Sequence, residues 1–161
     1  CAKLLSVPKA AQLICKSLAE KIRNKYKNID MVLSPAMGGI VVGYEIGRQL
    51  DVRTIFAERE NKNLVLRRGF SIPKKTNVLI VEDVITTGKS ALECEKLVKE
   101  NEGNLLGFAS IIDRSDKTNL IKREIISQIK FKIETFNENN LPDTLKNIKA
   151  EKPGSRNLKN A

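Results

Sequence analysis

Apolar and polar positions alternate along the chain in blocks that predict strands and helices in turn. An apolar stripe at helical spacing follows Pro8, a residue that the first turn of a helix tolerates, and it comprises Ala11, Ile14, Cys15, Leu18, Ala19 and Ile22. Beyond it, the pattern predicts strands at 31–34, 53–57, 77–83 and 105–112, and helices from Gly38-Gly39 to Leu50 and over 87–101. Repeated strand–helix–strand units predict an α/β fold with a mostly parallel sheet flanked by helices.

The other segments carry weaker patterns. Residues 58–75 are rich in charge and end at Pro73-Lys74-Lys75, which predicts a mobile loop or a hairpin. Gly103 is expected to stop the helix before it. Residues 129–136 alternate like a strand, and Pro142 is expected to open a short helix.

The segment 78–90 says most about function. Four apolar residues, Val78–Val81, predict a parallel strand buried on both faces, and the strand stops at the carboxylates of Glu82 and Asp83. In open α/β sheets this end of a strand is where ligands bind. The Thr/Gly/Ser turn at 86–90 then opens a helix, whose first N–H groups attract anions. An acidic pair beside a phosphate site suits a ribose 5-phosphate, because its hydroxyls need acceptors and its phosphate needs donors.

Three other interpretations of this segment are open to the sequence. Gly88-Lys89-Ser90 is similar to the end of a Walker A loop, but the first glycine of that motif would fall at Asp83, whose charge repels a polyphosphate. The glycine spacing of a Rossmann fingerprint is absent. A core strand that ends in a solvated acidic turn would explain the acidic pair alone, but not the whole block.

Length and composition limit the number of domains, the location of the protein and the kinds of catalytic site. A chain of 161 residues is expected to form one domain, 1–161, around a single core. No apolar run is long enough for a membrane span and nothing resembles a signal peptide, so we expect a soluble, cytoplasmic protein with no membrane partner. The cysteines Cys1, Cys15 and Cys94 lack metal-ligand spacing, and the last two are expected to be reduced thiols within helices. The absence of histidine excludes a Ser-His or Cys-His nucleophile and a histidine metal site.

The net charge of +10 raises the question of nucleic-acid binding. Lys and Arg are spread along the chain without a long basic run, and only 4% of residues are aromatic, so few side chains can stack on bases. A positive field also speeds the capture of anionic small molecules. We therefore expect no nucleic-acid partner.

The block 78–90 resembles the phosphoribosyl pyrophosphate (PRPP) loop of the type I phosphoribosyltransferases, with the loop itself at 82–90. That loop has four apolar residues, two acidic residues, two apolar residues and then Thr-x-Gly-x-Ser/Thr. Further blocks are similar to the orotate phosphoribosyltransferase family, and these are Ser34-Pro35-Ala36-Met37-Gly38-Gly39, Leu66-Arg67-Arg68-Gly69-Phe70, Asp113-Arg114 and Lys152-Pro153-Gly154-Ser155-Arg156. The resemblance covers nearly the whole chain and implies the type I phosphoribosyltransferase fold.

The resemblance also implies an activity and a set of roles. The activity is a glycosyltransferase reaction that moves the phosphoribosyl group of PRPP to orotate in pyrimidine (UMP) biosynthesis, with Mg²⁺ held mainly by substrate and water. Catalysis is assigned to Glu82 and Asp83, and orotate binding to Thr86 and Arg114, although Arg114 could instead form a surface ion pair with Asp113 or Asp116. PRPP binding is assigned to Glu82, Asp83, Val84, Ile85, Thr86, Thr87, Gly88, Lys89 and Ser90, and the pyrophosphate loop to Ala36, Met37, Gly38 and Gly39.

The chain also departs from the family pattern. An N-terminal segment that forms part of the hood over the base does not precede the first helix, so we expect the hood region to be incomplete. The pyrophosphate loop lacks the lysine of many members, and the mobile loop has no histidine. Its available cations are Arg59, Lys62, Arg67 and Arg68, any of which could instead be solvated hairpin residues.

Three expectations about assembly and function complete the picture. The resemblance implies a homodimer whose active sites are shared between subunits. A purine or other phosphoribosyltransferase remains an alternative function. So does a non-catalytic regulator that senses PRPP on the same fold.

Overall fold

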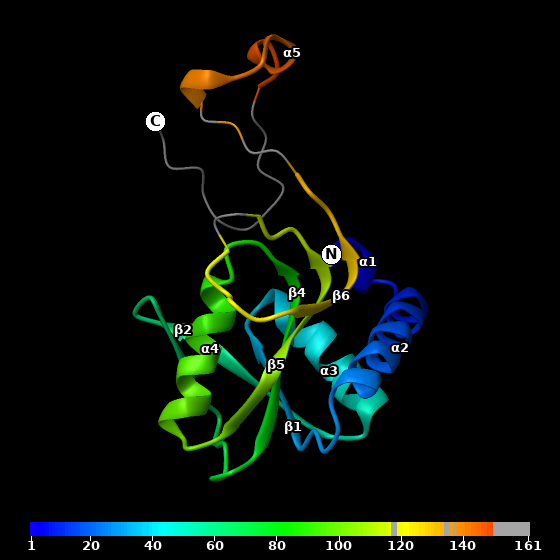
Figure 1. Ribbon diagram of the computed structural model, residues 1–161, viewed down its shortest axis with the longest axis vertical. Helices are drawn as coiled ribbons and strands as arrows, with labels where there is room; N and C mark the ends of the chain where they lie inside the picture. Colours follow the sequence, from blue (N-terminus) through cyan, green and yellow to red (C-terminus); the bar gives the residue numbers. More distant parts are fainter. Residues whose placement is uncertain (117–118, 134–135, 137, 150–161) are drawn as a thin grey trace.

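The computed structural model describes residues 1–116, 119–133, 136 and 138–149, and its centre is a six-stranded sheet (Figure 1). The strand order is β3-β2-β1-β4-β5-β6. Every neighbouring pair is parallel except β2 and β3, which are antiparallel. The strands are β1 (Met31–Pro35), β2 (Arg53–Glu60), β3 (Asn63–Leu66), β4 (Asn77–Ile85), β5 (Asn104–Asp113) and β6 (Ile125–Lys130). The predicted α/β fold with a mostly parallel sheet is confirmed.

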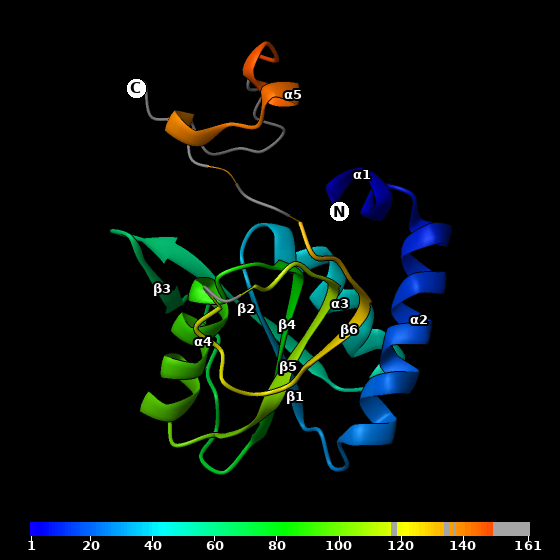
Figure 2. The same ribbon diagram turned by 45° about the horizontal axis from the view of Figure 1, so that its top comes forward.

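Helices cover both faces of the sheet. Figures 1 and 2 show α2 and α3 on one face and α4 on the other. The helical elements are α1 (Ala2–Leu5), α2 (Pro8–Lys25), α3 (Gly38–Leu50), α4 (Lys89–Glu100), a short 3-10 helix η1 (Glu138–Asn140) and α5 (Asp143–Lys146). The stripe predicted on the first long helix is the buried side of α2, where Cys15, Leu18 and Ile22 are fully buried. None of the helices in the described ranges is both long and apolar enough to cross a membrane.

The predicted core strand lies at the centre of the sheet. Its four residues Val78–Val81 are fully buried and alternate between the two layers. Leu79 and Val81 pack on the side of α2 and α3, whereas Val78 and Ile80 pack with Cys94 on the side of α4. Cys94 and Cys15 are free, buried thiols, as expected for cysteines that pack as small apolar side chains. Burial raises the pKa of Cys15 to about 12.

The path of the chain creates a switch point between β1 and β4. From β1 the chain crosses through α3 to β2 on one side, and from β4, on the other side of β1, it crosses through α4 to β5 in the opposite direction. Because these crossovers run in opposite directions, α3 and α4 lie on opposite faces, and the loops after β1 and β4 diverge at the carboxyl edge. This edge is where an open α/β sheet binds its ligand.

Two elements differ from the expectations. The last strand in the described ranges is Ile125–Lys130, and residues 131–133 of the predicted strand 129–136 lie beyond it, because Ile126 is buried beside α2 while the alternating Ile129, Phe131 and Ile133 are exposed. Residues 134 and 135 lie outside the described residues. Alternation alone does not make a strand when no layer covers its apolar side. The short helix α1 was not predicted.

The charged segment after β2 is a hairpin and not an open loop. Asn61 and Lys62 form its tight turn with φ of 47° and 71°, and Glu60 lies opposite Asn63. The helix expected after Pro142 is α5, which begins at Asp143. The block 152–156 lies outside the described residues.

Candidate functional site

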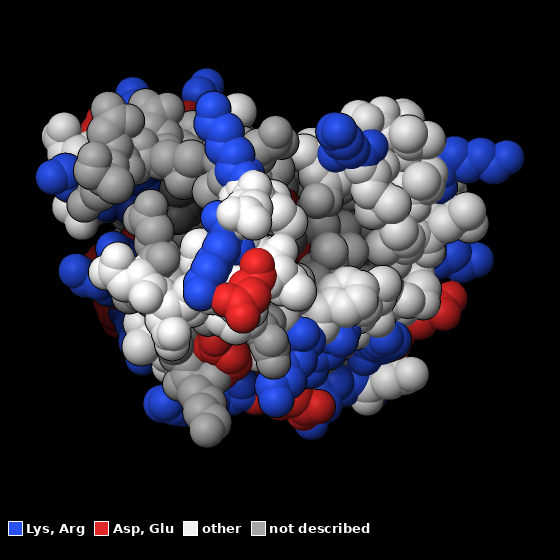
Figure 3. Space-filling view, turned by 90° about the horizontal axis from the view of Figure 1, so that it is seen from above, with Lys and Arg blue, Asp and Glu red and all other residues white. Residues whose placement is uncertain are grey.

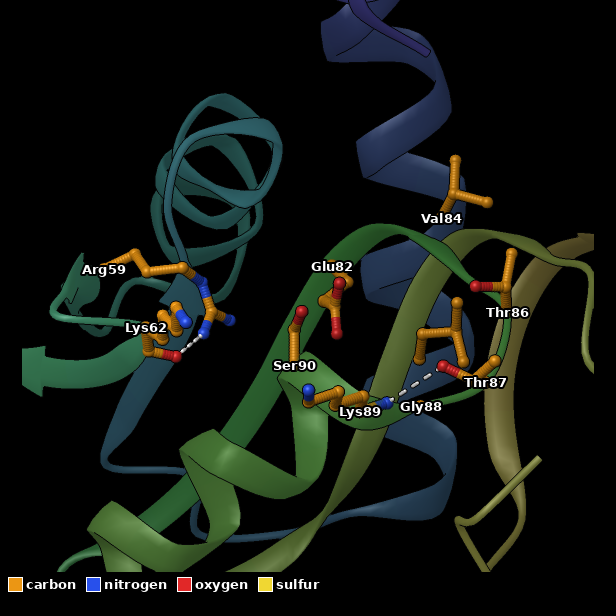
Figure 4. Close-up of a pocket in the computed structure, with 10 residues that line it drawn as sticks. Arg59, Lys62, Glu82, Val84, Thr86, Thr87, Gly88, Lys89 and Ser90 are labelled. Atoms are coloured by element: carbon orange, nitrogen blue, oxygen red, sulfur yellow. Dashed lines mark hydrogen bonds between the residues drawn. The ribbon is translucent and has the colours of Figure 1, made fainter. Parts of the chain in front are cut away.

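A cavity of about 530 Å³ opens at the carboxyl edge of the sheet, beside the switch point (Figure 4). It is lined by Arg59, Lys62, Glu82, Val84, Ile85, Thr86, Thr87, Gly88, Lys89 and Ser90. All residues of the predicted PRPP loop except Asp83 therefore line one cavity. In Figure 4, Arg59 and Lys62 lie on one side of Glu82 and Ser90, and Thr86 and Thr87 lie on the other.

The loop becomes helix α4 at Gly88. Gly88 is the N-cap with φ of 76°, and its carbonyl accepts the Leu92 N–H at 2.9 Å. A glycine brings no capping side chain, and the Lys89 N–H makes only a long bond of 3.5 Å to Thr87 Oγ1. N–H groups of the first turn are thus left for an anion at the positive end of the helix.

The segment after β5 supports this loop from outside. The Leu120 N–H donates to the Thr87 carbonyl at 2.9 Å, and the Arg114 N–H donates to the Ile85 carbonyl at 2.8 Å. A Cβ on Gly88 would lie 2.7 Å from an atom of Ile121, so this segment, rather than the ligand space, excludes a side chain there. Sequence reasoning missed residues 119–121, which carry no motif.

The two carboxylates of the acidic pair point to opposite sides of the sheet. Glu82 lines the cavity on the α4 side. The Asp83 carboxylate lies on the α3 side, where a Cβ on Gly38 would come within 2.8 Å of Asp83 Oδ1. Both residues belong to β4, in which successive side chains alternate between faces. Glu82 therefore lies in the same cavity as the predicted phosphate-binding residues 86–90, which we call the cradle, and Asp83 lies beside the predicted pyrophosphate loop.

The predicted pyrophosphate loop links β1 to α3. The Ala36 N–H donates to the Ala57 carbonyl at 2.8 Å, the Ala36–Met37 peptide is cis, and the Met37 side chain is 82% exposed. Gly38 and Gly39 then begin α3. Glycine at 38 leaves room for the Asp83 carboxylate beside the positive end of α3.

The four hairpin cations divide into two groups. Arg59 and Lys62 line the cavity; Arg59 bonds to Glu93 on α4 at 2.7 Å and donates to the Lys62 carbonyl. Arg67 lies 3.4 Å from Glu60, and Arg68 bonds to Glu58 through two nitrogens, which lowers the pKa of Glu58. Neither Arg67 nor Arg68 lines the cavity of its own chain.

Of the two predicted orotate ligands, Thr86 lines the cavity and Arg114 lies exposed directly after β5. The Asp113 carboxylate bonds to the Ser115 N–H at 2.8 Å and to Lys130 at 3.1 Å, and not to Arg114. Burial alone would raise the pKa of Asp113, but the bonds from Ser115 and Lys130 outweigh it and lower the pKa. Of the two ion pairs considered for Arg114, the pair with Asp113 is not formed.

The charges around the cavity suit a sugar that carries an anionic group at each end. Glu82 lies between the cradle at 86–90 and the cations Arg59 and Lys62. In the part of the chain that the structure describes, no group of three or more His, Cys, Asp or Glu side chains could hold a metal ion. Seen from above, Lys and Arg side chains are interspersed with acidic and uncharged ones (Figure 3).

Solved structures of phosphoribosyltransferases share this fold. Adenine phosphoribosyltransferase from Thermoanaerobacter pseudethanolicus superposes with a TM-score of 0.68 at 21% identity, over 80% of this chain and 84% of that one. UMP synthase from Leishmania donovani superposes with a TM-score of 0.64 at 17% identity, over 79% of this chain and 28% of that one. At such identities the likeness shows the fold alone.

Sequence relatives show the family. The Phosphoribosyl transferase domain matches residues 2–142. The orotate phosphoribosyltransferase of Caldicellulosiruptor saccharolyticus is 42% identical over 99% of this chain and 82% of its own length. That of Caldanaerobacter subterraneus subsp. tengcongensis is 42% identical over 98% of this chain and 82% of its own length. The chain therefore belongs to the orotate phosphoribosyltransferase family of the phosphoribosyl transferase domain proteins.

Proposed function

We propose that this chain transfers the 5-phosphoribosyl group of PRPP to orotate, giving orotidine 5′-phosphate and pyrophosphate in pyrimidine biosynthesis. The observation that carries the proposal is the cavity at the switch point, where the Glu82 carboxylate faces the start of α4 across a space lined by Thr86–Ser90. This combination offers acceptors for ribose hydroxyls and donors for a phosphate. Membership of the orotate phosphoribosyltransferase family identifies orotate as the base that accepts the phosphoribosyl group.

In this proposal each part of PRPP has its own neighbours. The 5′-phosphate binds the N–H and hydroxyl groups of residues 86–90, and the ribose hydroxyls bind Glu82. Asp83 contacts the ribose from the other side and faces the loop Ala36–Gly39, which receives the pyrophosphate. Orotate binds Thr86 and Arg114, whose guanidinium suits a carboxylate.

The reaction is a displacement at the anomeric carbon. A ring nitrogen of orotate forms a bond to that carbon as the bond to the pyrophosphate oxygen breaks, and the bonding electrons leave with pyrophosphate. Positive charge develops on the ribose in the transition state, and the carboxylates of Glu82 and Asp83 stabilise it. Positioning and electrostatics supply the catalysis, and no covalent nucleophile is required.

Magnesium fits this donor set. Glu82 and Asp83 provide carboxylate oxygens, the ligands that Mg²⁺ prefers, while the described residues offer no cage of three or more such ligands. An ion held mainly by PRPP oxygens and water matches that arrangement. When bound, Mg²⁺ would neutralise charge on the leaving pyrophosphate.

A homodimer is part of the proposal. Met37, Val41 and Tyr44 form an apolar stripe along one side of α3, with exposed fractions of 82%, 49% and 65%. Large exposed apolar side chains on one helix face are typical of an interface. Because this stripe begins in the pyrophosphate loop, a second copy packed against it would lie next to the active site, as sites shared between subunits require.

The test is a turnover assay with PRPP, Mg²⁺ and orotate, adenine, hypoxanthine or uracil in parallel. We expect pyrophosphate release with orotate and not with the other three bases. Preferential use of a purine would make the chain another phosphoribosyltransferase. Binding of PRPP without turnover of any base would instead favour a regulator that senses PRPP.

A further inference from the structure

The turn directly after β5 carries Arg114, one of the two proposed orotate ligands. Its backbone is held at two points. The Arg114 N–H donates to the Ile85 carbonyl at 2.8 Å, and the following Ser115 N–H donates to Asp113 Oδ1 at 2.8 Å. Because Ile85 immediately precedes Thr86, the first bond fixes the Arg114 backbone beside the other proposed orotate ligand. Arg114 therefore starts from a defined position at the carboxyl edge of the sheet.

This turn depends on the side chain of Asp113. An aspartate that accepts the N–H two residues further along closes an Asx-turn, which restricts the backbone of the residue between them. The Asp113 side chain is only 2% exposed, so it has little freedom to leave this position. The Asp113 carbonyl also accepts the Phe131 N–H at 2.8 Å. The turn that carries Arg114 is thus anchored through Asp113 to the end of the neighbouring strand β6.

A buried carboxylate beside Arg114 could compete with a ligand. A neighbouring carboxylate attracts a guanidinium as the carboxylate of a substrate does, and a guanidinium held in such a pair is lost to the substrate. Lys130 lies opposite Asp113 in the parallel register, and its Nζ is 3.1 Å from Asp113 Oδ2. Both carboxylate oxygens therefore have partners other than Arg114, which lies exposed.

We propose that Asp113 and Lys130 are positioning residues for orotate binding. Asp113 holds the turn that presents Arg114, and Lys130 neutralises Asp113 so that the Arg114 guanidinium stays available for the orotate carboxylate. Both residues act through Arg114 and not by contact with the substrate. The inference rests on the proposed function, which assigns orotate to Thr86 and Arg114, and it deepens that function by naming what controls the orotate ligand.

Lys130→Met removes the cation and keeps a side chain of similar length. We expect the KM for orotate to rise about tenfold, because the unpaired Asp113 draws the Arg114 guanidinium away from the substrate. The KM for PRPP and kcat at saturating substrate should change by less than about twofold. Lys130→Arg, which keeps the charge, should retain the parent KM for orotate. Steady-state kinetics measures these quantities, and calorimetry should show weaker binding of orotidine 5′-phosphate with unchanged binding of ribose 5-phosphate.

A second substitution at Asp113 separates positioning from stability. In the Asp113→Asn/Lys130→Met variant the asparagine still accepts the Ser115 N–H and has no charge to attract Arg114, so the KM for orotate should return to within about threefold of the parent value. Asp113→Ala/Lys130→Met loses the acceptor of the turn and should keep the KM about tenfold raised. Neither double variant contains an unpaired buried charge, so both provide the measurement even if Lys130→Met fails to fold.

A matched control and a cycle with Arg114 make the test specific. Lys25→Met breaks the pair with Glu124, 2.6 Å away and directly before β6, and should leave the KM for orotate unchanged. In the Arg114→Ala background, Lys130→Met should cause no further loss. An unchanged orotate KM in Lys130→Met, no recovery in Asp113→Asn/Lys130→Met, or additive losses with Arg114→Ala would overturn the positioning role alone. If the parent protein neither turns over orotate nor binds orotidine 5′-phosphate more tightly than ribose 5-phosphate, the proposed function fails and the positioning role fails with it.

Discussion

At the scale of single residues, the neighbouring carboxylates Glu82 and Asp83 have different surroundings. Glu82 shares a cavity with Thr86–Ser90, whereas Asp83 lies beside Gly38. We expect Glu82→Gln and Asp83→Asn each to lower kcat/KM by orders of magnitude, because in the proposed mechanism both charges stabilise the cationic ribose. The free energy of unfolding should change by about 1 kcal/mol or less.

Binding of ribose 5-phosphate, a part of the substrate, distinguishes the roles of the two carboxylates. Because Glu82 lines the cavity with the cradle, Glu82→Gln should weaken ribose 5-phosphate binding more than Asp83→Asn does. Isothermal calorimetry measures both affinities. Unchanged turnover in either variant would remove that carboxylate from the catalytic assignment.

Gly88 is constrained both by its backbone and by its neighbours. Its φ of 76° disfavours any side chain, and a Cβ would press on Asn119 and Ile121 at 2.7 Å. Gly69 offers a matched control, since its φ is 73° and nothing lies within 4 Å of a Cβ there. We expect Gly69→Ala to cost about 1 kcal/mol of stability from the backbone alone.

Gly88→Ala should cost more than Gly69→Ala and should also weaken PRPP binding, because residues 119–121 must move and the cradle moves with them. Thermal unfolding and calorimetry measure the two effects. Equal stability losses in the two variants, with tight PRPP binding in Gly88→Ala, would show that the 119–121 segment does not support the cradle.

At the scale of elements, the cations on and directly after the β2–β3 hairpin fall into two groups. Arg59 and Lys62 face the cavity of their own chain, whereas Arg67 and Arg68 are exposed, with side chains 54% and 63% accessible. If Arg67 and Arg68 complete the neighbouring subunit's site, an Asp83→Asn chain and an Arg67→Ala/Arg68→Ala chain should complement each other.

Hybrid dimers of those chains would then contain one intact site, and the mixture should recover part of the activity. The measurement is turnover of the mixture against the sum of the separate variants. The Arg59→Ala chain is the contrasting partner: because Arg59 lines the cavity of its own chain, its mixture with Asp83→Asn should recover nothing. Recovery there, or none with the first pair, would contradict this division of the hairpin.

The structure confirms the predicted strand Val78–Val81 and the helix after Gly88, yet moves the last strand to 125–130. Dense apolar runs and turn residues act on near neighbours, so they carry a local signal. The alternation at 129–136 is a local signal too, but without a layer above it the apolar side stays exposed.

At the scale of the whole molecule, the exposed stripe of α3 predicts how two copies meet. Tyr44→Glu places a charge in the stripe and should shift the proposed dimer to a monomer, with a loss of activity because the proposed sites are shared between subunits. Leu13→Glu on α2 is the control, since Leu13 is 63% exposed, similar to Tyr44, and should leave the dimer intact. Sedimentation at micromolar concentration measures the state, and an unchanged dimer in Tyr44→Glu would exclude this face.

Stability should depend on pH through Asp113. Because its bonds to Ser115 and Lys130 lower its folded pKa, the carboxylate stabilises the fold above the unfolded pKa of about 3.9. That contribution is lost as pH falls below about 4 and through the lowered folded pKa. We expect Asp113→Asn to be less stable by about 1–3 kcal/mol at pH 7, with the difference shrinking below pH 4.

Asp143→Asn is the control for this pH dependence. The Asp143 side chain is 93% exposed and, among the described residues, forms an ion pair with Lys146 of the same short helix, so its loss should change stability by less than about 0.5 kcal/mol at any pH. Chemical denaturation at several pH values measures both variants. A difference for Asp113→Asn that does not shrink in acid would contradict its linkage to folding.

The amino-acid sequence by itself determined the order of the elements, the mostly parallel sheet and the residues of the loop 82–90, because each can be read from local patterns: apolar runs, turn residues and the alternation of strands with helices. The organisation as one domain remains a prediction. Only the tertiary structure decided that Glu82 and Asp83 serve opposite faces, that Arg59 rather than Arg68 reaches the cavity, and that Ile121 supports Gly88. These outcomes depend on strand register and on pairs such as Arg59–Glu93, which lie far apart in sequence and leave no local pattern.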